Sequence, residues 1–176
     1  MRALEALKSL KVETHLVLTP WARTTLAHET ACSVDQLQSL ATVVHNPENQ
    51  AACISSGSFR TDGMLIAPCS MKTLAAIRTG YSANLLCRAA DVTLKERRKL
   101  VLLVRESPLS QIHIENMLAL AQMGTVICPP VPTFYNRPAT VEALVDGIVM
   151  RVLDQFGLSM PGVERWSGFN ADGGQA

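Results

Sequence analysis

Hydroxyl, cationic and carboxylate side chains follow two short apolar runs of this sequence. The runs are Met64–Ala67, closed by Pro68, and Leu100–Val104. The polar residues after them are Ser70, Lys72, Thr73, Arg105 and Glu106. Runs this short, bounded by turn or charged residues, predict strands that are buried on both faces. In an open parallel sheet, ligands bind outside the carboxyl ends of the strands, and a helix N-terminus there presents free N–H groups to phosphate. This stretch therefore predicts half of a phosphate-ligand site.

Each of these signals also has a plain structural interpretation. Ser70 at the start of a helix over 71–78 is a typical N-cap, and Lys72 would then be a solvated lysine. Arg105 and Glu106 would form an ion pair, or the arginine would set the pKa of a carboxylate used in proton transfer. The sequence has no GxxxxGK[ST] and no GxGxxG motif, which excludes the standard nucleotide loops. Thr19 strengthens the ligand interpretation, because it too falls where a predicted strand, 12–18, ends.

Further anion-binding candidates lie elsewhere in the chain. Arg88 and Lys95 are seven residues apart in a predicted helix over 83–97, so they share a helical face. Tyr135 stands in a Pro-rich loop and Arg151 in the last predicted helix, 140–156. The four histidines show no metal-ligand spacing along the sequence, so we expect no zinc or iron site.

The predicted elements that position these residues alternate between strand and helix. Further helices are expected over 2–10, 21–28, 33–40 and 110–123, and a further strand over 125–128, whereas 43–52 has a mixed pattern. This alternation predicts a three-layer α/β fold with a parallel sheet. We expect one domain over 1–166 and a flexible Gly-rich tail over 167–176.

Composition narrows the class of protein. The chain has 176 residues and a formal net charge of +1, without the basic excess of a nucleic-acid or membrane-surface binder. Its five cysteines have no CxxC spacing and predict reduced thiols of a cytoplasmic protein. No signal peptide and no apolar run of membrane-spanning length is recognisable.

Six segments carry a resemblance to a known family, the UbiX-type flavin prenyltransferases, which include the B subunits of phenolic-acid decarboxylase operons. The segments are SSGSF at 55–59, DGMLIAPCSMKTLA at 62–75, RAADVTLKERRKLVL at 88–102, RESPLSQIHIENM at 105–117, PPVPTFYNRP at 129–138 and RVLDQFG at 151–157. The resemblance implies a flavodoxin-like Rossmann fold and a homo-oligomer, typically a dodecamer built from trimers. It implies transfer of a dimethylallyl group from dimethylallyl phosphate to N5 and C6 of reduced FMN, without a metal. The prenylated FMN then serves a UbiD-type decarboxylase, often one that acts on aromatic acids.

The resemblance also implies roles for individual residues. The FMN-contacting positions are Thr19, Ser70, Met71, Lys72, Thr73 and Arg105. The positions that hold the prenyl phosphate are Arg88, Lys95, Tyr135 and Arg151. Glu29 and Glu106 match carboxylates near the reaction centre, and we expect these two and Lys95 to be catalytic. Trp166 matches an aromatic residue that helps to close the site. Either Glu106 or the departing phosphate dianion would take the proton from C6.

The sequence departs from the family at its N-terminus. Members begin with a buried strand and a Gly-rich turn before the first helix, whereas this sequence begins within that helix. The strand is central in a flavodoxin-like sheet, so its absence would leave two strands without a neighbour. Each unpaired backbone group would cost about 1–3 kcal/mol. One explanation, which we favour, is a start assigned too far downstream or a trimmed chain. The other is a short form that folds poorly or binds FMN weakly.

Two other functions stay open at this stage. A related fold carries FMN-dependent decarboxylases of peptidyl cysteine or phosphopantothenoylcysteine, but their catalytic histidine near the first helix and their Asn-containing motif have no match here. A flavin-carrying, non-catalytic subunit of an aromatic-acid decarboxylase is the other alternative.

Overall fold

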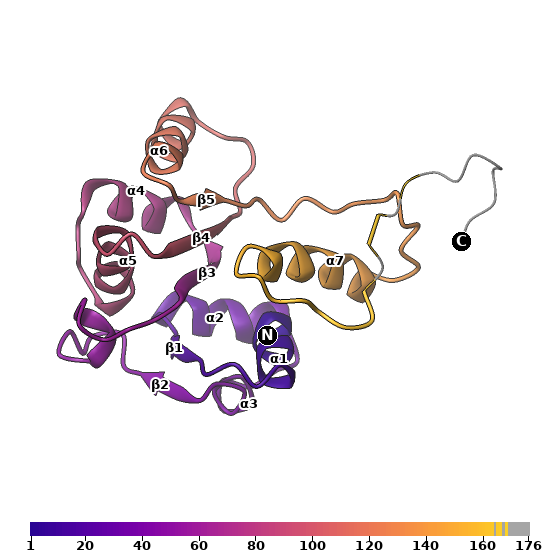
Figure 1. Ribbon diagram of the computed structural model, residues 1–176, viewed down its shortest axis with the longest axis horizontal. Helices are drawn as coiled ribbons and strands as arrows, with labels where there is room; N and C mark the ends of the chain where they lie inside the picture. Colours follow the sequence, from indigo (N-terminus) through magenta and orange to yellow (C-terminus); the bar gives the residue numbers. More distant parts are fainter. Residues whose placement is uncertain (164, 167, 169–176) are drawn as a thin grey trace.

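Strands and helices alternate along the chain in the computed structural model (Figure 1), which describes residues 1–163, 165, 166 and 168. The predicted tail lies outside the described residues, apart from Gly168. The elements are α1 (Arg2–Ser9), β1 (His15–Val17), α2 (Pro20–Glu29), α3 (Val34–Gln38), β2 (Val43–His45), the 3-10 turn η1 (Cys53–Ser55), β3 (Gly63–Cys69), α4 (Met71–Thr79), α5 (Leu85–Lys95), β4 (Lys99–Val104), α6 (Gln111–Gln122), β5 (Val126–Ile127) and α7 (Val141–Asp154).

The strands are all parallel and form two separate sheets. One sheet has the order β1-β2 and the other the order β3-β4-β5. Among the described residues, β1 and β3 each pair with a single strand. The apolar residues Leu16 and Leu65 on these two strands are only half-buried.

The β3-β4-β5 sheet carries the main core. In β4, Leu100, Val101, Leu102 and Val104 are all buried, as the continuous apolar run predicts. The strand β3 runs through Pro68 to Cys69, so the prediction that Pro68 ends this strand was wrong. Its pairing with β4 shifts register between Ile66 and Cys69, and this irregularity accommodates the proline.

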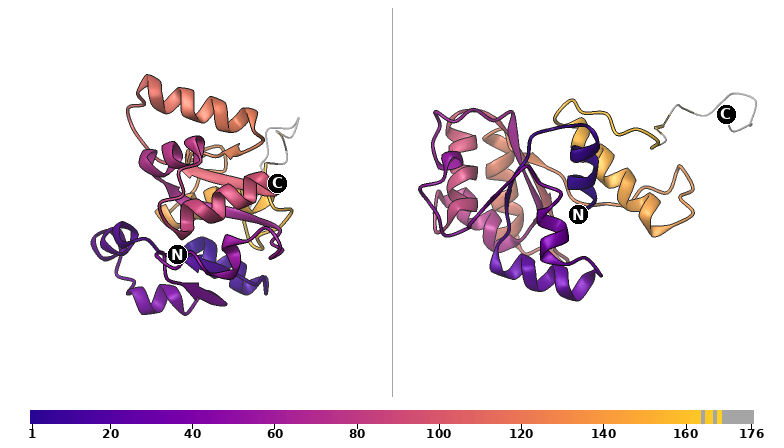
Figure 2. Two further views of the ribbon diagram at one scale, coloured as in Figure 1. Left: turned by 90° about the vertical axis from the view of Figure 1, so that its left-hand side faces the viewer. Right: turned by 90° about the horizontal axis from the view of Figure 1, so that it is seen from below.

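Helices cover both faces of this sheet. Figures 1 and 2 show α4 and α5 on one side of β3 and β4, and α1 and α7 on the other. The first group belongs to the main core, through Leu74 and Ile77 of α4 and Ala90 of α5. The second group forms a smaller core of its own, around Ala6 and Leu153. The three-layer α/β prediction is therefore confirmed.

Side-chain caps begin most of the helices, which explains why their starts were predictable. Thr19, Ser33, Asn84 and Thr140 each accept a hydrogen bond from a backbone N–H in the first turn of α2, α3, α5 and α7. Ser33 forms a reciprocal capping box with Gln36. By contrast, no single element was predicted for the segment 43–52, which contains the short strand β2. The turn η1 directly follows that segment and was not predicted either.

Candidate functional site

The carboxyl end of β3 delivers the chain directly into α4, and Ser70 makes that junction. The Ser70 hydroxyl accepts a hydrogen bond from the Thr73 N–H at 3.3 Å and donates to the Thr73 hydroxyl at 3.1 Å. The preceding N–H groups, of Met71 and Lys72, have no acceptor within the helix because they belong to its first turn. This N-terminus therefore presents hydrogen-bond donors and the positive end of the helix dipole to an anion.

The next strand end adds an arginine and a carboxylate beside a pocket. A pocket of about 360 Å³ is lined by Val104, Arg105, Glu106, Ser107, Pro129, Pro130 and Val131. The Arg105 N–H donates to the Cys69 carbonyl oxygen at 3.4 Å, which joins the ends of β3 and β4. The Glu106 carboxylate accepts from the Ser107 N–H at 3.0 Å and is exposed to solvent. Both side chains are thus available to a ligand in the pocket.

Electrostatic contacts place two more cations near these strand ends. Burial raises the pKa of the Cys87 thiol, and the positive charge of Lys72 opposes that rise. Burial likewise raises the pKa of the Cys128 thiol, which follows β5, against the charge of Arg151. Cys69 is fully buried, and burial raises its pKa to about 12, so this thiol is not a nucleophile.

The C-terminal part of the described chain brings two predicted aromatic residues together. The Tyr135 and Trp166 rings meet edge to face with their centroids 5.4 Å apart. On the nearby helix α7, Arg151 donates to the Asp154 carboxylate at 3.0 Å, and Arg165 donates to the same carboxylate at 2.6 Å. Asp154 therefore joins Arg151 to the segment that carries Trp166.

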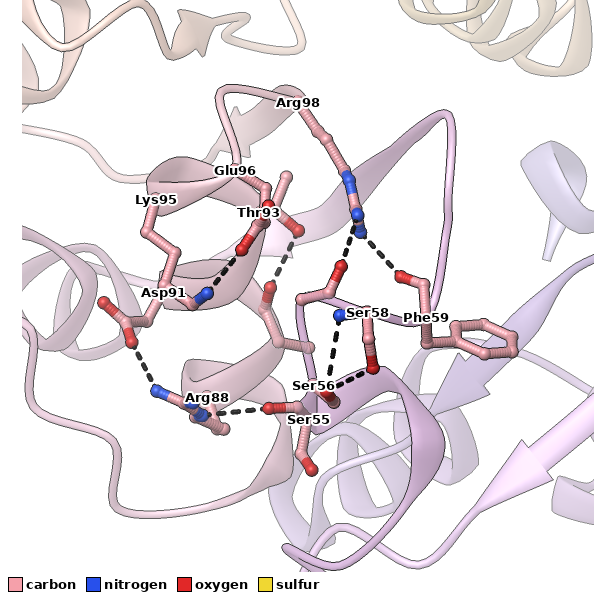
Figure 3. A network of polar contacts seen from close by, with 12 residues as sticks. Ser55, Ser56, Ser58, Phe59, Arg88, Asp91, Thr93, Lys95, Glu96 and Arg98 are labelled. Carbon is pink, nitrogen blue, oxygen red and sulfur yellow. Dashed lines mark hydrogen bonds and ion pairs between the residues drawn. The ribbon is translucent and has the colours of Figure 1, made fainter.

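The other two predicted phosphate-binding cations lie on α5 against the loop 55–59 (Figure 3). Arg88 donates to the Ser55 carbonyl oxygen at 3.1 Å and forms an ion pair with Asp91 at 2.8 Å. Lys95 forms an ion pair with Glu96, and both side chains lie where a Cβ on Gly57 would be. The close approach of these side-chain ends to Gly57 shows that the loop lies against the helix.

A single chain does not bring all the predicted site residues together. Lys95 ends α5 just before β4 begins, whereas Arg105 follows the last residue of β4. The two cations thus lie at opposite ends of a six-residue strand, roughly 17 Å long. Glu29 is the exposed last residue of α2, a ten-residue helix away from Thr19 at its N-cap. One copy therefore places the predicted site residues in separate groups, one at the carboxyl ends of the strands and one on α5.

Removing the Ser70 hydroxyl tests the role of the α4 N-terminus. We expect Ser70→Ala to destabilise the chain by about 1 kcal/mol through loss of the cap, and also to weaken binding of a phosphate-bearing ligand. Ser33→Ala is the matched control, because it removes a cap from α3, away from the pocket. Urea unfolding and ligand titration of both variants measure the two effects. Equal ligand affinity in the two variants would contradict the assignment.

The contacts of the Asp154 carboxylate predict how the free energy of unfolding depends on pH. Hydrogen bonding from Arg165, with the charge of Arg151, holds its pKa below the ordinary value of 3.8 despite partial burial. Its contribution to the free energy of unfolding is therefore fully present above that value and is lost as the pH falls through the lowered pKa. We expect the urea midpoints of wild type and Asp154→Asn to differ at pH 6 and to converge near pH 2. The exposed Glu48→Gln variant serves as control, and a difference that persists at pH 2 would contradict the assignment.

These features define the class of the protein: a parallel α/β chain with groups suited to an anionic ligand at the carboxyl ends of its strands. The flavoprotein family matches residues 1–153. A probable UbiX-like flavin prenyltransferase of Bacillus subtilis (strain 168) is 59% identical over 176 residues, which are 100% of this chain and 86% of the relative. A second one, from Streptomyces sp. (strain D7), is 61% identical over 97% of this chain and 86% of its own length. The chain belongs to the UbiX-type flavin prenyltransferase family.

Solved structures agree with this assignment. A dodecameric FMN-dependent UbiX-like decarboxylase from Escherichia coli O157:H7 superimposes with a TM-score of 0.93 at 59% identity, over 95% of this chain and 91% of the other. AnUbiX (PadA1), in complex with FMN and dimethylallyl pyrophosphate, gives a TM-score of 0.95 at 51% identity over 96% and 90%. The peptidyl-cysteine decarboxylase EpiD is only 16% identical, with a TM-score of 0.56 over 84% and 87%, and shares the fold alone.

One cluster was not anticipated from spacing along the sequence. His15 of β1 and His45 of β2 stack with their ring centroids 5.1 Å apart, and Cys53 of η1 lies beside them. Burial and the neighbouring His15 lower the pKa of His45. The only sequence signal available was that both histidines fall in β-rich segments, 30 residues apart.

Proposed function

We propose that this chain transfers a dimethylallyl group from dimethylallyl phosphate to N5 and C6 of reduced FMN. The observation that carries the proposal is the convergence of Ser70, Arg105 and Glu106 at the carboxyl ends of β3 and β4. Membership of the flavin prenyltransferase family supports it, as does the relative that binds FMN together with dimethylallyl pyrophosphate. FMN supplies the nucleophilic ring positions, and the chain needs no metal for this transfer.

The donor groups at these strand ends suit a flavin. The N–H groups of Met71 and Lys72, with the hydroxyls of Ser70 and Thr73, offer a set of hydrogen bonds to an anionic or carbonyl oxygen. Arg105 adds a planar cation at the mouth of the pocket. Thr19 caps α2 at the end of β1 and presents a hydroxyl from the other sheet.

The prenyl phosphate requires cations that meet the charge growing on the departing oxygen. Tyr135 and Arg151 provide a phenol and a guanidinium from the C-terminal half of the chain. Lys95 lies at the opposite end of β4 from Arg105 within one chain, so we assign Lys95, together with Arg88 on the same helix α5, to a neighbouring copy. Trp166 packs on Tyr135 and would exclude water from the reacting allyl group.

A site that takes residues from two copies of the chain requires a homo-oligomer. Exposed apolar side chains along one helix, α6, provide a surface for it: Ile112 is 66% exposed, Ile114 53% and Leu118 58%. The dodecamer of the E. coli relative supports a closed assembly, which we propose is built from trimers. Within the described part of the chain, no helix combines the length and apolarity that crossing a bilayer requires.

The product, prenylated FMN, would pass to a UbiD-type decarboxylase acting on aromatic acids. The five cysteines are free thiols, which supports a reducing compartment such as the cytoplasm. The domain responsible for the transfer would comprise residues 1–166, with 167–176 as its tail.

A direct assay tests the proposal. The chain is incubated anaerobically with reduced FMN and either dimethylallyl phosphate or dimethylallyl pyrophosphate, and the flavin is analysed by mass spectrometry. We expect a mass increase of one prenyl group with the monophosphate and slower conversion with the pyrophosphate. Bound FMN without an adduct from either donor would overturn the transferase assignment and favour a flavin-carrying subunit. Release of CO2 from a C-terminal cysteine peptide would favour a cysteine decarboxylase instead.

A further inference from the structure

Three potential metal ligands meet on one face of the β1-β2 sheet. The register pairs His15 with Val43 and Val17 with His45, so the two histidines project from the same face. The Nδ1 atom of His15 lies 2.8 Å from the Nε2 atom of His45. The Cys53 Sγ completes a group whose ligand atoms all lie within 4.8 Å of one another.

The surroundings of His15 are those of a metal-binding histidine. The Glu13 carboxylate lies 3.3 Å from its Nε2, and a carboxylate at that position holds the proton on Nε2 and leaves the Nδ1 lone pair free. The Phe59 ring packs edge-on against the imidazole, with the centroids 5.2 Å apart, and fixes its orientation. Both imidazoles are half-buried, whereas Cys53 is exposed and gives an ion a path of entry.

From this geometry we propose that His15, His45 and Cys53 bind one Zn²⁺ ion, separate from the flavin site. Zinc prefers nitrogen and thiolate ligands at about 2.0–2.1 Å and 2.3 Å in tetrahedral geometry, which requires the two nitrogens to lie roughly 3.3 Å apart. The pair at 2.8 Å must open by about 0.5 Å, a change within side-chain reach. Water takes the fourth position.

Binding exchanges one hydrogen bond for three bonds to the metal, two from imidazole nitrogens and one from the thiolate. In the metal-free protein one imidazole donates to the other, and with zinc bound both ring nitrogens face the ion as lone pairs. The donor imidazole transfers its proton, through solvent, to its other ring nitrogen, and the Cys53 thiol loses its proton to solvent as it becomes a thiolate. No oxidant or other reactant is needed.

The ion would tie η1 to the β1-β2 sheet. Cys53 begins η1 and Ser55 ends it, and the Ser55 carbonyl accepts the hydrogen bond from Arg88 (Figure 3). Zinc would therefore stabilise the long connection between β2 and β3, whose only regular element is the short turn η1. It would take no part in prenyl transfer. The readouts of the proposal are accordingly metal content, spectrum and stability.

Metal titration of the whole chain tests the proposal. Chelator-treated protein is titrated with Zn²⁺ and, as a spectroscopic probe, with Co²⁺. We expect one ion per chain, a thiolate-to-Co²⁺ charge-transfer band with the visible absorption of a tetrahedral site, and a Tm increase of about 5–10 °C at roughly 100-fold excess over the Kd. Weak binding of less than one ion per chain, or a Co²⁺ spectrum without the thiolate band, would overturn the assignment.

Variants identify the ligands. Cys53→Ser changes an exposed residue, so it should fold while losing the thiolate band and most of the Tm increase. His45→Gln should weaken Zn²⁺ binding by at least 10-fold. Cys32→Ser, which removes a thiol outside the cluster, is the matched control and should behave as wild type. Binding that survives Cys53→Ser, or that is lost equally in Cys32→Ser, would show that these three residues do not form the site.

Discussion

Mixed oligomers of two inactive variants, Lys95→Ala and Arg105→Ala, are expected to regain prenyl transfer. Each substitution alone removes one charged group from the reacting centre and should lower kcat by about 10²- to 10³-fold. The two residues lie at opposite ends of β4, so one site would take them from different copies. When the variants are co-assembled in equal amounts, about a quarter of the sites receive both native residues. Activity should therefore return to about a quarter of the wild-type value.

A second pair of variants provides the control. Arg88 and Lys95 lie on the same helix, α5, so both would enter a site from the same copy. Mixing Arg88→Ala with Lys95→Ala should therefore restore no activity. No recovery in the first mixture, or equal recovery in the two mixtures, would contradict a site shared between copies. Native mass spectrometry of each mixture establishes that the chains have exchanged.

Glu106→Gln is expected to lower the rate of product formation by about 10²- to 10⁴-fold, the usual contribution of a positioned acid or base. The carboxylate lines the pocket beside Arg105, and closing the new ring onto C6 requires loss of a proton. The amide has nearly the same shape, so FMN affinity should change little. Product formation in single turnovers, followed by mass spectrometry, measures the rate.

The matched control is Glu115→Gln, which changes an exposed carboxylate on α6. It should leave the rate as in wild type. The Glu106 variant also decides between two bases. If Glu106→Gln reacts at the wild-type rate, the departing phosphate dianion takes the proton, and the role assigned to Glu106 is wrong.

Local signals explain what the sequence predicted well. The Ser33 and Ser70 caps depend on hydrogen bonds within three residues, so their patterns can be recognised in the chain itself. The strand β4 is buried on both faces, and its unbroken apolar run records that burial. Short elements carry no comparable signal: β2 has three residues, and one of them, Val44, is exposed at the sheet edge. Its existence depends on pairing with β1 rather than on its own composition.

The arrangement of the site depended on contacts between distant segments. Helical spacing correctly put Arg88 and Lys95 on one face of α5, but spacing does not reveal that this face packs on the loop 55–59. The roles expected of the individual site residues came from the resemblance to the prenyltransferases. The separation of Lys95 from Arg105 became visible only in the fold. His15 and His45 meet through parallel pairing of two strands, which no local motif records.

The division of the strands into two sheets has a consequence for amide hydrogen exchange. The β1-β2 pair and the β3-β4-β5 sheet share no ladder among the described residues, and the larger core cluster belongs wholly to the second sheet and its helices. The chain should therefore open in two stages, with β1 and β2 losing protection at a free-energy cost well below that of global unfolding. Denaturant would then reveal a partly open species that precedes global unfolding.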